Sequence, residues 1–329
     1  MKGNDFSGKA MEGTERQRRL RPMERTACKM SEQKKISCIA LDLDGTTLKD
    51  DKQISERNRK AIEDAVSAGV SVVIASGRSF SSLPESVTSI PGIEYAVTSN
   101  GAAVYRVRDG VRIHKVLLEP ESVDEILRIT GGIRLGMEAF IRGIPYAQKD
   151  YIGDPVSYGA MPYAVSYIQS TRRPVENIRE YVRSRRKELD GIDLIVADEE
   201  KRKEIREALE SARLPLYVTS SVKNRVETAA QGAGKAEGLR FLQKLLGIPR
   251  EETAAFGDAD NDIDMLRAAG FSFAMENASP GCRAAADFIT KTNQEDGVAF
   301  GIYEVLGIPE SGAEPDAHAP EGGAPDYCT

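Results

Sequence analysis

Short apolar runs alternate with helix-like stretches in the first part of the chain. Residues 36–41 and 70–75 are rich in aliphatic side chains, which is typical of buried strands. Between them, apolar positions recur at helical spacing over residues 61–66, with Ser55 as a suitable N-cap and Gly69 as a stop. This order predicts a strand, a helix and a second strand parallel to the first.

The same alternation returns toward the C-terminus. Leucines repeat at helical spacing over residues 239–246, and Gly247 ends that pattern. A short helix is expected over residues 262–269. Further strands are expected at residues 95–98, 253–256, 271–275 and 288–290. The predicted fold class is α/β, with a doubly wound, Rossmann-like parallel-sheet core.

A stretch of different composition interrupts this pattern. Two strongly charged helical patterns lie near residues 175–189 and 199–212, and five of the eleven tyrosines lie between Tyr146 and Tyr167. Such a change inside one alternating pattern indicates an inserted α+β domain. The expected core comprises residues 35–118 and 223–308, and the expected insert comprises residues 119–222.

Both ends of the chain lack the apolar content of a core. Residues 1–34 show no apolar periodicity, and residues 309–329 hold four Pro, three Gly and five acidic residues but no Lys or Arg. Segments of this kind bury too little apolar surface to fold. They predict a flexible N-terminal tail and a disordered C-terminal tail.

Composition and charge exclude several classes of protein. Lys and Arg number 45 against 51 Asp and Glu, and the net charge of −6 argues against nucleic acid as a partner. The sequence contains no run of 18 or more apolar residues, so it predicts no membrane span. Two histidines do not supply a His-rich zinc site or a His-based triad. Four cysteines without CxxC spacing fit a reducing cytoplasm.

Polar residues that could carry chemistry follow four of the predicted strands. They include Asp42 with Asp44, Ser76, Asn100 and Asp258. Ligands of open parallel sheets bind beyond the carboxyl ends of the strands. One acidic pair could simply form a turn, but carboxylates from two strand ends would repel one another unless a cation lay between them. Oxygen ligands without nearby His or Cys favour Mg²⁺.

Several ordered stretches are similar to the motifs of a known family. They are Asp42-Leu-Asp-Gly-Thr-Thr-Leu48, Ser76-Gly-Arg78, Ser99-Asn-Gly-Ala102, Lys235 before a helix and Gly257-Asp-Ala-Asp-Asn-Asp262. Together they resemble the haloacid dehalogenase (HAD) superfamily and, more narrowly, its Cof-like (type IIB) sugar phosphatases. The resemblance covers about residues 35–306, with the insert matched only by position. Ser76 stands where Thr is more usual, and Ala236 where Gly is common.

The resemblance implies roles for individual residues. Asp42 would be the nucleophile that forms an aspartyl-phosphate, and Asp44 would be the general acid and base. Ser76 and Lys235 would hold the transferring phosphoryl group. Candidate residues for further substrate binding are Gly77, Asn100 and Asn261.

The resemblance also implies a metal ion and a substrate class. Asp42 and Asp258 would ligate Mg²⁺ together with the carbonyl of Asp44, and Asp262 would support them. The expected activity is Mg²⁺-dependent hydrolysis of a small phosphomonoester, such as a sugar phosphate, with pyridoxal phosphate or flavin mononucleotide also open. The insert would act as a cap that sets specificity, no protein partner is implied, and the cytoplasm is the expected location.

Two other functions stay open at this point. A phosphosugar mutase would return the phosphoryl group to a sugar hydroxyl, and a non-catalytic regulator would bind a phosphometabolite without turning it over. A pure binder has no need of an acid two residues after a nucleophile, so Asp42 and Asp44 argue against the regulator.

Some of these residues also have simpler interpretations. Arg78 can pair with a nearby carboxylate and brace a loop. Asp258, Asp260 and Asp262 have the opening spacing of a calcium-binding EF-hand loop, but Ile263 replaces its required Gly.

The tyrosine-rich segment of the insert also has two interpretations. Its Gly and Pro residues predict loops that join short strands. The rings could cover a half-buried sheet, or one or two of them could close over the leaving group of a substrate.

Overall fold

The computed structural model describes residues 35–312, which contain an eight-stranded and a six-stranded β-sheet. In the larger sheet the strand order is β14-β13-β12-β1-β2-β3-β4-β5. The first six strands in this order run parallel, and β4 and β5 add an antiparallel edge. The strands are β1 (Cys38–Leu41), β2 (Ser71–Ala75), β3 (Tyr95–Thr98), β4 (Ala103–Arg106), β5 (Val111–Lys115), β12 (Thr253–Gly257), β13 (Phe271–Ala274) and β14 (Phe288–Ile289).

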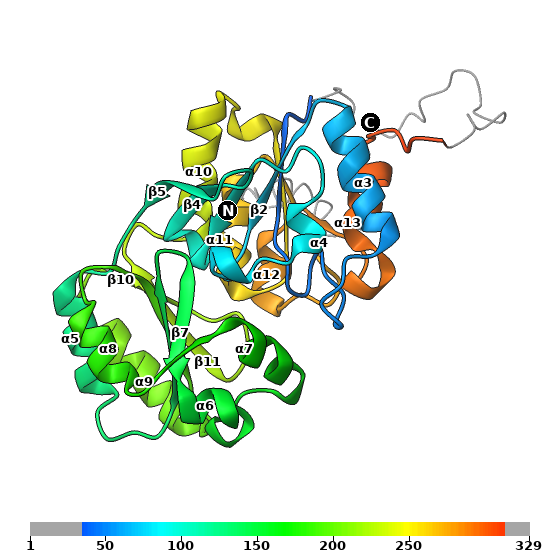
Figure 1. The fold of residues 1–329 in the computed structure, drawn as a ribbon. Coiled ribbons are helices and arrows are strands. Elements are labelled where there is room, and N and C mark those ends of the chain that lie inside the picture. The colour runs from blue at the N-terminus through cyan, green and yellow to red at the C-terminus, as the bar shows by residue number, and fades with distance from the viewer. Residues whose placement is uncertain (1–34, 313–329) are drawn as a thin grey trace, which may run out of the picture. The chain divides into compact units, whose positions relative to one another are not determined.

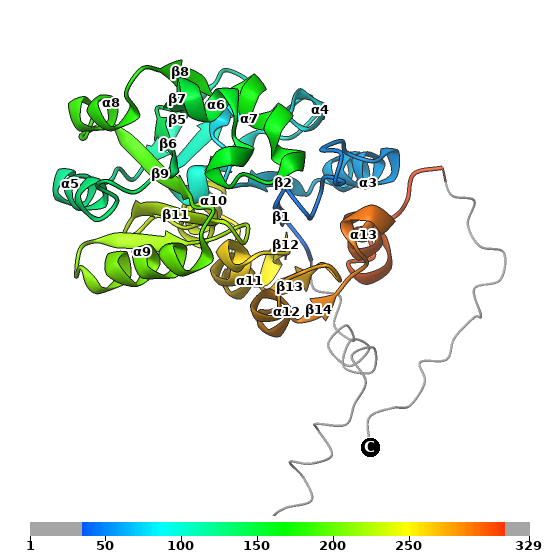
Figure 2. The ribbon, with the colours of Figure 1, turned by 90° about the horizontal axis from the view of Figure 1, so that it is seen from below.

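Helices cover both faces of this sheet (Figures 1 and 2). The chain passes from β1 to β2 through the helix at residues 56–67, and from β12 to β13, in the opposite direction across the sheet, through the helix at residues 263–268. Right-handed connections therefore put these two helices on opposite faces of the sheet. The predicted doubly wound α/β core is confirmed. The helices are α3 (Glu56–Ser67), α4 (Glu85–Thr88), α10 (Lys235–Leu246), α11 (Ile263–Ala268), α12 (Pro280–Ala285) and α13 (Gly297–Phe300).

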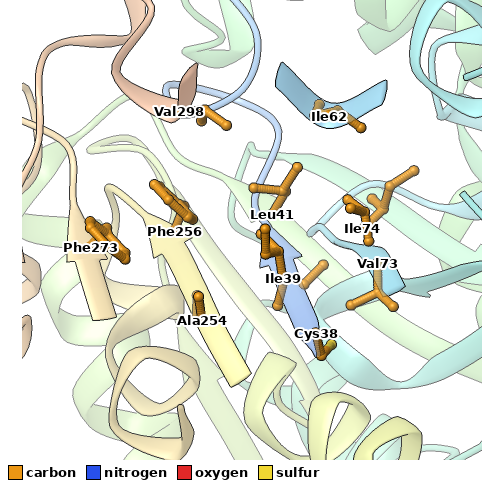
Figure 3. Close-up of a cluster of buried hydrophobic side chains, with 14 of the residues drawn as sticks. Cys38, Ile39, Leu41, Ile62, Val73, Ile74, Ala254, Phe256, Phe273 and Val298 are labelled. Atoms are coloured by element: carbon orange, nitrogen blue, oxygen red, sulfur yellow. The ribbon is translucent and has the colours of Figure 1, made fainter. Parts of the chain in front are cut away.

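The hydrophobic core lies on both sides of β1 (Figure 3). All four residues of this strand are buried, which explains why its sequence is continuously apolar. Phe256 and Phe273 from the neighbouring strands stack with ring centroids 4.3 Å apart. Cys38 packs in this core as a small apolar residue. The packed strands form a fixed platform for the residues at their carboxyl ends.

The smaller sheet belongs to the segment between β5 and α10. Its strand order is β10-β11-β9-β6-β7-β8, and every neighbouring pair is antiparallel except β7 with β8. The strands are β6 (Gly136–Ile141), β7 (Ile144–Gln148), β8 (Arg173–Val175), β9 (Leu189–Ile195), β10 (Leu216–Thr219) and β11 (Arg225–Ala230). Its helices are α5 (Pro120–Ile129), α6 (Lys149–Gly153), α7 (Val165–Thr171), α8 (Ile178–Ser184) and α9 (Glu199–Ser211).

The two faces of the smaller sheet differ in chemistry. Ile192 and Leu194 pack in an apolar cluster that includes residues of α5, α8 and α9. Asp193 and Ile195 point the other way, because successive side chains of a strand alternate between faces. Ile195 packs with Tyr151, while Asp193 pairs with Arg225. The sheet therefore presents buried charged groups on the face opposite these three helices.

The smaller sheet extends beyond the boundary expected at residue 222. Strand β11 pairs with both β9 and β10. Its Arg225 and Glu227 lie on the charged face, so the strand lacks the apolar run by which other strands can be recognised.

The tyrosine-rich segment is helical, and the prediction of loops between short strands is wrong. Residues 149–171 form α6, two short 3₁₀ turns and α7, and only Tyr146 lies in a strand. The residues that suggested loops lie at the ends of these turns: Pro155 precedes one, Gly159 ends it in a left-handed conformation, and Pro162 opens the next.

The predicted tails lie largely outside the described residues. This holds for residues 1–34 and 313–329. Part of the expected C-terminal tail is described, and there the Ser311 N–H donates a hydrogen bond to Asp64 Oδ2 of α3 at 3.0 Å. No helix within residues 35–312 is long and apolar enough to cross a membrane.

Candidate active site

The carboxyl ends of β1, β2 and β12 meet at one edge of the larger sheet. Asp42, Ser76 and Asp258 directly follow these three strands. All three line a cavity of about 540 Å³. The segment between β5 and α10 also contributes to the wall of this cavity, with Phe140, Tyr163, Tyr167, Arg172, Ile195, Arg225 and Glu227.

Three carboxylates and one ammonium group form the centre of the site. Oxygen atoms of Asp42, Asp258 and Asp262 lie within 4.8 Å of one another. Lys235, the first residue of α10, donates hydrogen bonds from Nζ to Asp42 Oδ1 at 2.6 Å and to Asp262 Oδ1 at 2.7 Å. Its side chain is only 1% exposed. A lysine at a helix N-terminus is unfavourable by itself, and these two anions compensate for it.

The charges in this cluster do not balance. Burial raises the pKa of Asp42 well above its usual range, although Lys235 acts to lower it. Burial and the neighbouring Asp262 raise the pKa of Asp258 to about 7. Burial alone would lower the pKa of Lys235, but Asp262 and Asp42 more than offset it, and the pKa is raised. Three carboxylates facing one ammonium group leave excess negative charge, which a further cation would compensate.

The donor set fits a hard divalent cation. Carboxylate oxygens are preferred ligands of Mg²⁺, and Asp42 and Asp258 face the cavity. Asp262 is already engaged, because its Oδ2 accepts the N–H groups of Asp258 and Ala259 at 3.0 Å while its Oδ1 accepts Lys235. Its geometry suits an orienting group better than a metal ligand.

The loop after β1 holds the carboxylate of Asp258. Thr46 Oγ1 donates a hydrogen bond to Asp258 Oδ1 at 2.8 Å. Gly45 has a φ of +83°, and a Cβ there would collide with the same carboxylate. Only glycine combines this left-handed backbone with so close an approach.

Asp44 lies in a separate cluster of charges. Arg78 donates from Nε to Asp44 Oδ2 at 2.6 Å and from Nη2 to Asp44 Oδ1 at 2.8 Å, and Lys52 Nζ donates to Oδ1 at 2.9 Å. Burial would raise the pKa of Asp44, but the hydrogen bonds and charges of these two cations hold it well below its usual range. The interpretation of Arg78 as a loop brace that pairs with a carboxylate is confirmed.

A backbone hydrogen bond connects the residues after β2 and β3, because the Asn100 N–H donates to the Ser76 carbonyl at 3.2 Å. Ser76 Oγ accepts the N–H of Arg78 at 3.2 Å, and a Cβ at Gly77 would lie 3.1 Å from Asn100 Oδ1. Asn100 itself has a left-handed backbone, with φ 51° and ψ 40°. Asparagine tolerates this conformation better than most residues. Ser76, Gly77 and Asn261 line the cavity, while Asn100 lies behind Gly77.

Asn100 connects the two sheets. Its Nδ2 donates to Glu227 Oε2 of β11 at 3.0 Å, and its Oδ1 accepts Asn261 Nδ2 at 2.9 Å. Because a carboxylate only accepts hydrogen bonds, Glu227 fixes the direction of both amide groups. Asn261 Oδ1 is buried and has no hydrogen-bond partner among residues 35–312.

Comparison with known proteins decides the family. The haloacid dehalogenase-like hydrolase family matches residues 39–302 of this chain. The chain belongs to this family. One relative is the 5-amino-6-(5-phospho-D-ribitylamino)uracil phosphatase YcsE of Bacillus subtilis (strain 168), which is 31% identical over 267 residues. That alignment covers 81% of this chain and 94% of the relative.

Solved structures agree with this assignment. A haloacid dehalogenase-like hydrolase from B. subtilis superimposes with a TM-score of 0.73 at 28% identity and covers 82% of this chain and 100% of its own. A HAD subclass IIB sugar phosphatase has the same fold, with a TM-score of 0.68 at 22% identity over 83% of this chain and 100% of its own. The predicted resemblance is confirmed, and the chain is an enzyme of the phosphoric monoester hydrolase class.

Several residues of this HAD site were not predicted from the sequence. Thr46 could have been found from its motif, since it directly follows Asp44-Gly45. Arg172 and Glu227 carry no such signal, because their partners Glu138 and Asn100 lie 34 and 127 positions away. Their side chains reach the site only because the smaller sheet brings them there.

Proposed function

We propose that this HAD-family phosphatase hydrolyses a small phosphomonoester through an aspartyl-phosphate formed on Asp42, with Mg²⁺ as cofactor. The observation that carries the proposal is the pairing of buried Asp42 with Lys235 beside Asp258 at the floor of the cavity. A nucleophilic carboxylate needs a nearby positive charge to approach a phosphate dianion.

In the first step, an Asp42 oxygen attacks phosphorus and the bond from phosphorus to the leaving oxygen breaks. Lys235 lies 2.6 Å from Asp42 Oδ1 and stabilises negative charge on the transferring oxygens. Ser76 and the Gly77 backbone line the same cavity and would contribute donors to those oxygens. Asn100 and Asn261 would hold this wall in place through their mutual hydrogen bond.

Asp44 is the proposed proton carrier for both steps. Arg78 and Lys52 keep free Asp44 ionised, so a substrate that binds as the monoanion supplies the proton, which passes through Asp44 to the leaving oxygen in the first step. In the second step a water molecule attacks the phosphorus of the aspartyl-phosphate, its proton passes to Asp44, and the bond to Asp42 breaks. Asp44 then passes this proton to the phosphate product, which leaves, and both carboxylates return to their ionised forms.

Asp42 and Asp258, with the backbone carbonyl of Asp44, are the proposed Mg²⁺ ligands, and Asp262 is the proposed orienting residue. A bound Mg²⁺ supplies charge neutralisation for the phosphoryl oxygens and for the carboxylates themselves. The raised pKa values of Asp42 and Asp258, which come first from burial and then from neighbouring carboxylates, support this assignment, since a bound cation would stabilise both ionised forms.

The proposed substrate is a small metabolite whose leaving group is accommodated by the smaller sheet and its helices, which act as a cap. A cavity of about 540 Å³ has the size typical of small-molecule sites. The name of the B. subtilis relative makes phosphorylated ribitylamino-pyrimidines candidates beside sugar phosphates. Buried free thiols at Cys38 and Cys282 support a cytoplasmic location.

A panel of phosphorylated metabolites, assayed with Mg²⁺ for release of inorganic phosphate, tests this proposal. We expect one group of phosphomonoesters to be hydrolysed well above the others. Transfer of the phosphoryl group to a second sugar position would instead support the mutase. Tight binding with no turnover of any phosphomonoester would support a regulator and contradict the proposal.

A further inference from the structure

The two cations that hold Asp44 each lie against a tyrosine ring of the helical segment 149–171. Lys52 Nζ is 5.6 Å from the ring centroid of Tyr163, and the guanidinium carbon of Arg78 is 4.5 Å from the ring centroid of Tyr167. Both distances are in the range of cation–π interactions. The position of Asp44 is thus connected, through its cations, to a segment more than 100 residues later in the chain.

The Tyr167 contact is the more strongly fixed of the two. Arg78 uses its guanidinium edge for Asp44 and for the carbonyl of Ser82, so Tyr167 contacts it across the face. The Arg78 side chain is 7% exposed, whereas that of Lys52 is 30% exposed. A buried planar group held at both edge and face has little freedom to rotate.

Tyr167 is itself anchored on the smaller sheet. The guanidinium carbon of Arg172 also lies 4.5 Å from its ring centroid. Arg172 Nη2 donates to Glu138 Oε2 at 2.6 Å, and Glu138 also accepts Tyr151 Oη at 2.8 Å. Arg172 and Glu138 have side chains only 2% and 0% exposed. The ring is therefore tied to a buried ion pair that cannot move without exposing unpaired charge.

We propose that Tyr167 is a positioning residue for proton transfer, which sets the place of the Asp44 carboxylate through Arg78. The inference rests on the proposed function, in which Asp44 carries the proton. A proton transfer depends on a donor and an acceptor held within hydrogen-bond reach of each other. Without the Tyr167 ring, the face of the Arg78 guanidinium is uncovered. Arg78 then no longer holds the Asp44 carboxylate in one position.

Two substrates of nearly the same shape test this inference on the full-length protein with Mg²⁺. The leaving group of p-nitrophenyl phosphate departs with little help from an acid, whereas that of phenyl phosphate is more basic and needs a proton. We expect Tyr167→Leu to lower kcat/KM, which reports the step in which the leaving group departs, about 10- to 100-fold more on phenyl phosphate than on p-nitrophenyl phosphate. This is part of the roughly 10²–10⁴-fold that acid catalysis contributes. Tyr167→Phe retains the ring and should restore the wild-type ratio of the two rates.

Tyr158→Leu is the matched control. Tyr158 lies in the same segment with its ring against Arg134 and Tyr151, and it contacts neither Asp44 nor its cations. Its ratio of rates should equal that of the wild type. Equal losses of kcat/KM on both substrates in Tyr167→Leu would overturn the inference and leave Tyr167 as part of the cavity wall.

Two further variants keep the test decisive. Asp44→Asn should show the same leaving-group-dependent loss, only larger. If it does and Tyr167→Leu does not, the inference fails alone. If Asp44→Asn lowers kcat/KM equally on both substrates, the role of Asp44 as the acid fails and the inference fails with it. Should Tyr167→Leu not fold, Arg78→Lys replaces it, because lysine keeps the charge but loses the fork and the stacked face. An unchanged ratio in Arg78→Lys would also overturn the inference.

Discussion

Lys235 illustrates how single side chains in this site depend on their neighbours. A buried ammonium group is costly unless anions surround it, and here Asp42 and Asp262 both accept its hydrogen bonds. The same ammonium group holds the carboxylate of Asp42, the proposed nucleophile, in place. Residues that hold these charges without touching the substrate therefore also contribute to the metal affinity and activity of such a site.

Thr46 provides a test of this dependence. Thr46→Val keeps the shape of the side chain but removes the hydrogen bond to Asp258 Oδ1. Loss of an outer partner of a metal ligand costs about 10- to 100-fold in metal affinity. We expect the Mg²⁺ concentration for half-maximal activity to rise by a factor in this range, measured by Mg²⁺ titration of p-nitrophenyl phosphate hydrolysis. Thr88→Val, in α4 away from the cavity, is the control and should leave the titration unchanged.

Among the helices and strands, the pattern of apolar residues determined which elements could be predicted from the sequence. Strands β1, β2, β3 and β12 are buried runs, so their sequences identify them to within one or two residues. Strand β11 alternates apolar residues with Arg225 and Glu227, whose charges are satisfied by partners far away in the sequence. Because no local sequence pattern indicates such distant partners, the sequence did not predict that β11 belongs to the smaller sheet.

The packing of α3 against the C-terminal end of the described chain has a predicted pH dependence. Asp64 of α3 accepts hydrogen bonds from Tyr303 Oη at 2.8 Å and from Ser311 N at 3.0 Å, and Lys60 Nζ lies 3.0 Å away. Burial would raise the pKa of Asp64, but these hydrogen bonds hold it well below its usual value. Because the unfolded chain binds this proton more readily, the stabilisation is present above pH 4 and is lost as the pH falls further.

We therefore expect Asp64→Asn to lower Tm at pH 7 by about 3–6 °C, given the usual strength of hydrogen bonds to a charged group. Thermal unfolding of both proteins from pH 7 down to pH 3 checks this expectation, and the difference in Tm should shrink below pH 4. A difference that stays constant over this range would show that the charge of Asp64 contributes nothing.

For the whole molecule, the central feature is one cavity built by two sheets. The larger sheet supplies Asp42 and Asp258, whose motifs at strand ends make them predictable from sequence. The smaller sheet supplies Arg172 and Glu227, which only the folded chain brings to the cavity. The predictable half of the site is the half proposed to act on the phosphoryl group, which all candidate substrates share. The half that could not be predicted is the one proposed to face the leaving group, in which the candidate substrates differ.

Removal of metal should change both activity and stability. We expect hydrolysis of p-nitrophenyl phosphate to require Mg²⁺ and to disappear with EDTA, because Asp42 and Asp258 repel one another without a cation. Mg²⁺ should also raise Tm, since it binds only the folded protein. Asp258→Asn should raise Tm in EDTA by removing this repulsion and should make Tm insensitive to Mg²⁺. Full activity in EDTA, or a fall in Tm for Asp258→Asn in EDTA, would contradict the metal assignment.

The most direct test of the account is to identify the residue that carries the phosphoryl group. Asp44→Asn should accumulate the aspartyl-phosphate, because its breakdown needs the base that the variant lacks. The variant is mixed with acetyl phosphate and Mg²⁺, quenched in acid and treated with borohydride, which reduces an acyl phosphate to an alcohol. Peptide mass spectrometry should then find homoserine at position 42, and nowhere in the double variant that also carries Asp42→Asn. Reduction at another carboxylate, or steady hydrolysis by Asp42→Asn alone, would contradict Asp42 as the nucleophile.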